Sequence, residues 1–158
     1  MAGEVKSQGT HLYFVDRTGT PTLVKMTCPT GISGLTGGAA DTIETTCLDD
    51  TDTRTYARGL NAAAAISVPF ILKPADLGHQ SLFTLKESGA ILDWIALLSD
   101  GTAAPTLTSG AITPPTTRTS FTFSGYISEV AVDVSNTEVV RGTLTVQRSG
   151  PATPHWKA

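Results

Sequence analysis

Residues 41–60 read DTIETTCLDDTDTRTYARGL, an alternating segment followed by an acidic segment and then by one rich in arginine. Ile43, Thr45 and Cys47 alternate with their neighbours, and this period of two predicts a strand with one buried face. The acidic segment predicts a turn that ends the strand, because the short carboxylate side chain of aspartate bonds to nearby backbone N–H groups. Its members are Asp49, Asp50 and Asp52.

The segment after the turn is unusual for a connecting loop. Arg54, Tyr56 and Arg58 are large side chains with polar tips, and such residues are enriched where one protein surface meets another. For an isolated domain the simpler interpretation is a solvated turn in which the aspartates and arginines pair weakly. The residue types alone leave both interpretations open.

The length and composition describe one domain with an unusual surface. At 158 residues the chain can bury a substantial core, and we expect one domain over residues 1–150 and a C-terminal tail at 151–158. Charged residues make up 16% of the chain, against about 25% in ordinary soluble domains, which suggests that partners cover part of the surface. The formal net charge of −3 argues against a nucleic-acid binder, which carries a basic patch.

The remaining segments predict a mainly β fold, since the chain contains 26 threonines and threonine favours strands over helices. Strands are expected at residues 11–16, 22–27, 62–73, 91–98, 119–135 and 140–148. Pro69 predicts that its strand lies at a sheet edge or a bulge. The apolar positions of the longest strand shift by one near Ser128 and Glu129, which predicts a β-bulge. Residues 99–118 are expected to form an extended surface loop.

One helix is expected. Asp76 is a good N-cap for a short helix that runs to Ser88, and Gly89 is a good stop. Gly78 weakens the first turn, so packing against a sheet must hold the helix. The residues expected on its apolar side are Leu77, Phe83 and Leu85.

The sequence contains no recognisable catalytic constellation. His11, His79 and His155 fall in a strand, a helix start and the tail, and no two of them have metal-ligand spacing. The aspartates of residues 49–52 resemble the start of a calcium loop, but the required glycine and terminal glutamate do not follow at the right distances. We therefore expect no enzyme, no metal site and no cofactor.

Two further observations bear on the environment of the chain. Cys28 and Cys47 are expected to stay reduced, as thiols of cytosolically made proteins usually do. The most apolar run, residues 62–72, is shorter than the roughly 20 residues that a membrane span needs. No membrane partner is therefore expected.

Four sequence segments, taken in order, carry a resemblance that covers residues from about 10 to 150. They are D-x-I-E-T-T-C-L-D-D-x-D-x-R-x-Y-x-x-G-L, A-x-I-S-V-P-F, F-S-G-Y-I-S-E-V and T-L-T-V-Q-R-S-G. Together they resemble the major tail tube proteins of long-tailed, siphovirus-like bacteriophages. The resemblance implies a β-sandwich or partly closed β-barrel with one short flanking helix. It also implies hexameric rings that stack into a hollow tube, with similar folds in contractile-tail inner tubes and type VI secretion tubes.

The resemblance also implies roles for particular residues. The long loop that reaches the next ring in this family corresponds to residues 48–60, so the resemblance favours contact over a solvated turn. The residues expected to contribute to ring stacking are Asp49, Asp50, Asp52, Arg54, Tyr56 and Arg58. A lumen for DNA should be neutral or acidic, because a wall that attracted phosphates would hold the DNA. The acids expected to face it are Glu44, Glu129 and Asp133.

The partners follow from the same resemblance. They are further copies of the chain, the tape-measure protein, and the tail-tip and tail-terminator proteins, with DNA passing through the lumen without specific binding. The expected location is the virion tail, assembled in the host cytoplasm. The alternative is a monomeric β-sandwich binding module, such as an adhesin or carbohydrate-binding domain, which predicts exposed aromatic side chains clustered on one face.

Overall fold

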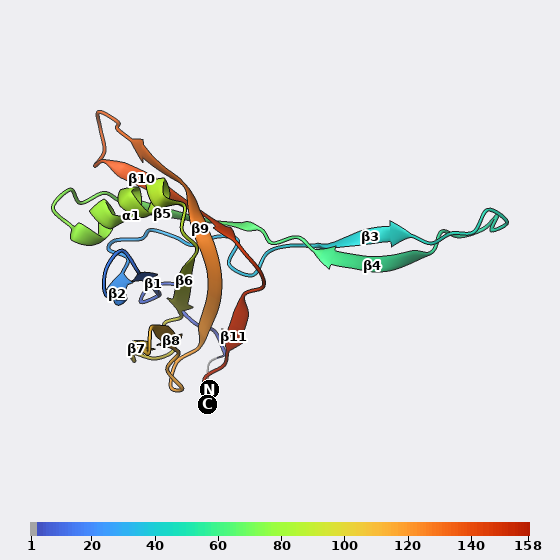
Figure 1. Cartoon of the computed structure of the whole chain (residues 1–158), viewed down its shortest axis with the longest axis horizontal. Coiled ribbons are helices and arrows are strands. Elements are labelled where there is room, and N and C mark those ends of the chain that lie inside the picture. The colour runs from blue at the N-terminus through green and yellow to red at the C-terminus, as the bar shows by residue number, and fades with distance from the viewer. Residues whose placement is uncertain (1–2) are drawn as a thin grey trace.

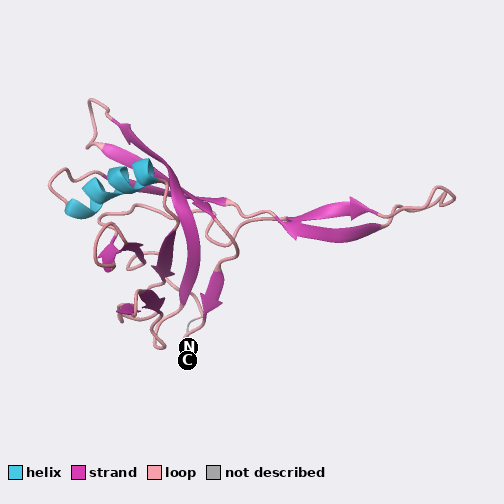
Figure 2. Ribbon diagram, in the orientation of Figure 1, coloured by secondary structure: helices cyan, strands magenta, loops and turns pink. Residues whose placement is uncertain are grey.

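A seven-stranded antiparallel sheet forms the body of the molecule in the computed structural model, which describes residues 3–158 (Figures 1 and 2). Its strand order is β2 (Thr22–Lys25), β1 (His11–Asp16), β6 (Leu92–Leu97), β9 (Ser120–Asp133), β10 (Arg141–Arg148) and β5 (Ala65–Ile71). A further strand, β11 (Thr153–His155), pairs with the start of β9. The sheet curves around its core without closing, so the mainly β fold with one flanking helix is confirmed.

The expected bulge lies in β9, the longest strand. Glu129 pairs with Thr145 and Ile127 pairs with Val146, so Ser128 is an extra residue in the ladder. One extra residue shifts the side-chain alternation by one position. As a result Ile127 is buried and Val130 packs against the same core, although one number is odd and the other even.

The core lies on the concave side of this sheet. β10 alternates strictly, with Leu144 and Val146 buried and the threonines between them on the opposite face. Trp94 of β6 is fully buried, and its indole N–H donates to the carbonyl oxygen of Gly125 at 3.1 Å. Burial of each large apolar side chain contributes about 1.5–3 kcal/mol, so β6, β9 and β10 carry much of the stability.

The helix α1 (Leu77–Ser88) has the expected ends. The Asp76 carboxylate accepts from the N–H groups of Gly78 at 2.7 Å and His79 at 3.4 Å, and Gly89 follows with a left-handed φ of 65°. Its expected apolar side is wrong in two positions, since Leu77 and Phe83 are exposed. The buried side consists of His79, Leu82 and Leu85, whose spacing of three keeps them on one face.

A buried histidine completes the packing of this helix. His79 accepts from the Lys73 N–H at Nδ1 (3.0 Å) and lies 2.7 Å from the Thr27 carbonyl oxygen at Nε2. Nε2 therefore carries the hydrogen and donates to Thr27, which leaves a neutral ring. The ring also lies against Phe70, with centroids 4.9 Å apart.

The loop expected at residues 99–118 is partly ordered into a hairpin. β7 (Thr106–Thr108) pairs with β8 (Ala111–Thr113), and Ser109 and Gly110 both have positive φ, as a tight two-residue hairpin requires. Three paired residues on each side are too short a pattern to stand out in a Pro- and Thr-rich sequence. The C-terminal segment, which we expected to be a tail, contributes β11 to the sheet.

The strand β5 lies at the edge of the sheet, as Pro69 predicts. Residues 28–33 run along its outer side without forming a regular strand. The N–H of Thr30 donates to the Pro69 carbonyl at 2.8 Å, and Ser33 and Ser67 exchange two backbone hydrogen bonds. This edge is therefore covered within the chain.

Candidate functional site

A long hairpin projects from the body and is the most distinctive feature of the molecule (Figure 1). We call residues 40–61 the arm; it consists of β3 (Ala40–Glu44), β4 (Tyr56–Asn61) and the residues between them. The two strands form a separate antiparallel sheet in which Glu44 faces Tyr56 and Thr42 faces Arg58. Beyond Glu44 the pairing continues, since the N–H of Thr45 donates to the Thr55 carbonyl at 2.8 Å.

Both faces of the arm are exposed to solvent. Ile43 is 55% exposed, Leu60 is 85% exposed, and Leu48 near the tip is completely exposed. The expectation that β3 buries one face is therefore wrong. Its alternating pattern forms a strand as predicted, but no other element of the described chain packs against either side of it.

The tip of the arm is an acidic turn, as expected. The backbone N–H of Asp50 donates to the Cys47 carbonyl at 3.1 Å, and the Asp50 carboxylate accepts from the Cys47 N–H at 3.2 Å. This reciprocal pair shapes the turn, and Asp49 and Asp52 lie exposed beside it. Both cysteine thiols are free, with Cys47 exposed at the tip and Cys28 in the body.

All six residues predicted for the contact loop lie on the arm. Arg54 approaches Glu44 at 3.9 Å, and both side chains are about half exposed or more. Such a pair contributes about 0–1 kcal/mol. Arg58 donates to the side chain of Asn61 at 2.7 Å, while Tyr56 lies across from Glu44. These contacts leave most of the polar groups available to a partner.

The arm holds the whole net charge of the protein. Residues 41–60 contain five acids and two arginines, a balance of −3, which equals the formal net charge of the full chain. The remaining residues are therefore balanced, with nine acids and nine cations. An acidic arm on a neutral body is an arrangement that the total charge alone does not reveal.

The three acids predicted to face a lumen do not form one group. Glu44 lies on the arm, whereas Glu129 and Asp133 lie exposed on β9, opposite Thr145 and Arg141 of β10. On this face β10 carries Arg141, Thr143, Thr145 and Gln147, and β5 carries Ala65, Ser67, Pro69 and Ile71. The convex face of the sheet is thus mostly polar on β9 and β10, with two acids on β9 and one arginine on β10.

Two exposed leucines on the arm, Leu48 and Leu60, were not among the residues predicted from the sequence to make contacts. Leu48 and Leu60 were inside the expected contact loop but were given no role. A single exposed leucine is ordinary on a protein surface, but these two lie on an arm that also exposes Ile43 and Tyr56. The available signal for Leu48 was its position directly before the aspartate run that predicts a turn.

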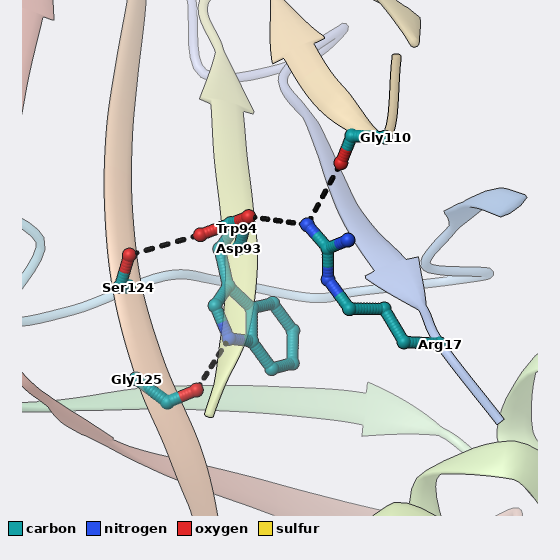
Figure 3. Close-up of polar contacts among 6 residues, drawn as sticks. All are labelled: Arg17, Asp93, Trp94, Gly110, Ser124 and Gly125. Atoms are coloured by element: carbon teal, nitrogen blue, oxygen red, sulfur yellow. Dashed lines mark hydrogen bonds and ion pairs between the residues drawn. The ribbon is translucent and has the colours of Figure 1, made fainter. Parts of the chain in front are cut away.

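A shallow hollow of about 450 Å³ over β6 and β9 is lined by two serines, a histidine and an aspartate. They are not arranged for nucleophilic catalysis. Ser124 donates to Asp93, which is also bound by Arg17 at 2.7 Å (Figure 3). His155 instead shares a 2.9 Å hydrogen bond with Thr122. A catalytic triad requires the serine and the histidine to bond each other.

The same cluster has a structural role that Figure 3 makes clear. Arg17, from the turn after β1, also donates to the Gly110 carbonyl at 2.8 Å. It thereby ties the β7–β8 hairpin to β6 and, through Asp93 and Ser124, to β9.

Within residues 3–158, no group of three or more His, Cys, Asp or Glu side chains could hold a metal ion, and no helix is long and apolar enough to cross a membrane.

Comparison with known proteins identifies relatives of the whole chain. A family model described as "Phage tail tube, TTP, lambda-like" matches residues 3–158. Structural protein 3 of Pseudomonas phage PAJU2 is 36% identical over 151 residues, which cover 92% of this chain and 90% of that protein.

Two solved structures show the same fold at low sequence identity. A chain of the PVC sheath/tube terminator, from an extracellular contractile injection system in the extended state, aligns with a TM-score of 0.70 and 12% identity over 99% of both chains. The SPP1 tail tube aligns with a TM-score of 0.65 and 12% identity, over 96% of this chain and 79% of that one.

Proposed function

The chain belongs to the lambda-like phage tail tube family, whose members are structural proteins of the virion tail and not enzymes. From this premise we propose that six copies form a ring and that rings stack into a hollow tube for DNA. The arm is the single observation that carries the proposal. It supplies a contact surface that the isolated chain leaves without a partner.

The arm is weakly stabilised within a single copy of the chain. A two-stranded hairpin is marginally stable in water on its own, and this one exposes Ile43, Tyr56, Leu48 and Leu60. Exposed strand edges and apolar side chains are a liability in a monomer. They become useful if another copy of the chain covers them.

We assign the covering surface to a copy in the adjacent ring. The arm extends well beyond the body (Figure 2), so it can bridge a distance that the compact body cannot. Its acids and arginines can pair across the contact, since Arg54 and Glu44 hold each other only loosely. The stacking residues are Asp49, Asp50, Asp52, Arg54, Tyr56 and Arg58, with Leu48 and Leu60 as apolar anchors.

Within a ring, we propose that sheets join edge to edge. β6 pairs with β9 only as far as Gly125, and among the described residues no strand pairs with residues 126–133 on that side. This edge can pair with a strand of a neighbouring copy. Such a seam has the same hydrogen bonds as the sheet itself.

We assign the convex face of β5, β9 and β10 to the lumen. Its serine, threonines and glutamine are uncharged, and Glu129 and Asp133 outweigh Arg141, so that one net negative charge remains on this face. Glu44 belongs instead to the arm. A polar, acidic wall releases no counterions on contact with DNA, so DNA can slide past it.

The remaining partners are proposed on the same basis. A tape-measure protein would occupy the lumen before DNA, and tail-tip and terminator proteins would bind the two ends of the tube. The fold relative in the PVC sheath/tube terminator supports this arrangement. Assembly would take place in the host cytoplasm before the tail joins the virion.

The binding-module alternative gains no support from the exposed aromatics. It predicts that they cluster on one face, but Tyr56, Phe83, Tyr126 and Trp156 lie on the arm, on α1, on β9 and after β11. Trp156 contacts Phe121 edge to face, with centroids 6.1 Å apart.

Negative-stain electron microscopy of the purified chain over a range of concentrations tests the proposal. We expect wild-type tubes with a central hole, and few or shorter tubes for the double variant Asp50→Ala/Arg54→Ala. The matched control is Lys86→Ala/Glu87→Ala, which removes an exposed pair from α1 and should assemble like wild type. Unchanged tube number and length in the arm variant would exclude these two residues from ring stacking.

A further inference from the structure

The arm joins the body through two short legs, and both legs are held by the end of one strand. The first leg comprises residues 33–39 and the second comprises residues 62–64. They bond to each other, since the N–H of Ala62 donates to the Ala39 carbonyl at 3.0 Å and that of Ala64 donates to the Gly37 carbonyl at 3.3 Å. We call these legs the arm root.

Arg148, in the last position of β10, binds the first leg. Its side chain is 7% exposed. It donates to the Leu35 carbonyl at 2.8 Å, to the Gly37 carbonyl at 2.5 Å and to the Gly150 carbonyl at 3.0 Å. None of the ion pairs found among residues 3–158 involves it. The neighbouring Gln147 donates to the Ala63 carbonyl of the second leg at 3.3 Å.

A buried cation held only by carbonyl groups is a costly arrangement. Desolvation disfavours the charge, and no carboxylate compensates for it. What the guanidinium offers is a planar fork of donors in fixed geometry, which holds several acceptors in one relative orientation. At the arm root this fork fixes the first leg against β10 at Leu35 and Gly37.

Two glycines of the first leg, Gly34 and Gly38, lie in close contact with the backbone of residues 62–65. A Cβ on Gly34 would lie 2.4 Å from the Ala65 carbonyl oxygen, and one on Gly38 would lie 2.0 Å from that of Ala62. Both residues also have positive φ, which side-chain-bearing residues rarely adopt. The legs therefore lie as close together as the backbone allows.

The geometry assigns Arg148 as a positioning residue that sets the direction in which the arm leaves the body, so that the arm is already oriented in the free chain. A strand rises about 3.3 Å per residue, so the tip lies roughly 26 Å beyond the root, and a swing of about 10° there moves it by about 5 Å. Pre-orientation reduces the entropy lost when the arm docks. That consequence for assembly rests on the proposed function, whereas the orientation itself does not.

The experiment measures the arm's direction in the unassembled full-length chain. Cys47 at the tip is a natural labelling position, Cys28→Ser removes the other thiol, and Thr84→Cys provides a second position on the exposed side of α1. Double electron–electron resonance then gives the distribution of distances between two spin labels. We expect a narrow distribution, and one at least twofold wider in Arg148→Met.

The matched control is Arg141→Met, the same substitution on the same strand at an exposed position that pairs with Glu138. It should leave the distribution unchanged. A broad distribution in the starting protein, or equal widths in Arg148→Met and Arg141→Met, would overturn the inference. If Arg148→Met loses its cooperative unfolding transition, the distance distribution is measured instead in Arg148→Lys and Gln147→Met. These variants should also give wider distributions than Arg141→Met, and equal widths would overturn the inference.

Assembly is measured separately on the same variants. If the arm also serves ring stacking, Arg148→Met should slow tube formation, because a less oriented arm loses more entropy on docking, and Arg141→Met should not. A wider distribution with normal tubes would support the positioning role and contradict the contribution of pre-orientation to assembly, while excision of the outer arm tests stacking itself. The two inferences can therefore fail independently.

Discussion

Arg118, like Arg148, is a buried arginine that binds carbonyl groups in place of a carboxylate. It donates to the carbonyls of Gly9 at 2.7 Å and Ala103 at 3.1 Å, and also to those of Leu97 and Leu98. Burial lowers the pKa of its guanidinium from the usual value, but the group stays charged at neutral pH. Arg118 thus holds the segment before β1 and the loop after β6 against the start of β9.

Replacing Arg118 should destabilise the body. Arg118→Met keeps the apolar stem but leaves several carbonyls without a donor, at about 1–3 kcal/mol for each one that stays buried. Some will become hydrated, so we expect a total loss of about 2–4 kcal/mol in the free energy of unfolding. Urea denaturation measures it, with Arg141→Met as the exposed control. A loss below that of the control would contradict the account.

The N-cap of α1 makes a prediction with a defined pH dependence. Hydrogen bonds from the Thr27 side chain and from the N–H groups of Gly78 and His79 lower the pKa of Asp76, although partial desolvation opposes them. A carboxyl group with a lowered folded pKa stabilises the protein above its unfolded pKa of about 3.9. This contribution is lost as the pH falls through the folded pKa.

Asp76→Ala should therefore cost about 1 kcal/mol at neutral pH, with a smaller difference from wild type below pH of about 4. Asp76→Asn keeps a capping oxygen and should lose less. Thermal unfolding at several pH values gives the comparison. A difference that stays constant or grows on acidification would show that the Asp76 charge does not stabilise the cap.

At the scale of elements, the arm and the body are built on different principles. The body strands bury one face in a shared core, whereas β3 and β4 bury neither. The body should therefore fold without the arm. The arm should matter only to contacts between copies.

Excision of the outer arm tests this division. Residues 45–55 are replaced by Asn-Gly, a turn suited to joining the opposed residues Glu44 and Tyr56. The free energy of unfolding should change by less than about 1 kcal/mol, a melting shift of roughly 3 °C or less for this size. Tubes should not form. Normal tubes from a well-folded excision variant would exclude the outer arm from stacking.

The sequence predicted the body elements well because their periodicities are strong. The bulge in β9 was visible as a shift of the apolar positions at Ser128, and both ends of α1 were visible as Asp76 and Gly89. The exposure of β3 was not visible, since an alternating pattern is the same whether the apolar face meets a core or a partner. Nor were the buried roles of Arg118 and Arg148, because arginine is usually exposed and nothing local marks the exceptions.

At the scale of the whole molecule, charge is divided between two surfaces with different tasks. The arm carries the net charge, and the convex face of the sheet carries Glu129 and Asp133 with one arginine, Arg141, among mostly uncharged side chains. Because a DNA conduit must not bind phosphates, the sign of charge on that face should matter more than the identity of its residues.

Reversing the charge on that face should impair DNA passage without preventing assembly. We expect Glu129→Lys/Asp133→Lys to form tubes but to slow DNA ejection from phage particles that carry the variant, with partial recovery at higher salt as the attraction is screened. Glu87→Lys on α1 is the control and should eject normally. Unchanged ejection kinetics in the double variant would place these residues away from the lumen.

The most direct test of the whole account is a cryo-electron microscopy reconstruction of tubes assembled from the purified chain. The account predicts six subunits per ring, the convex face of β5, β9 and β10 around the central channel, and each arm docked on a subunit of the adjacent ring. Arms that lie free on the outer surface of the tube, or that contact only subunits of their own ring, would contradict it.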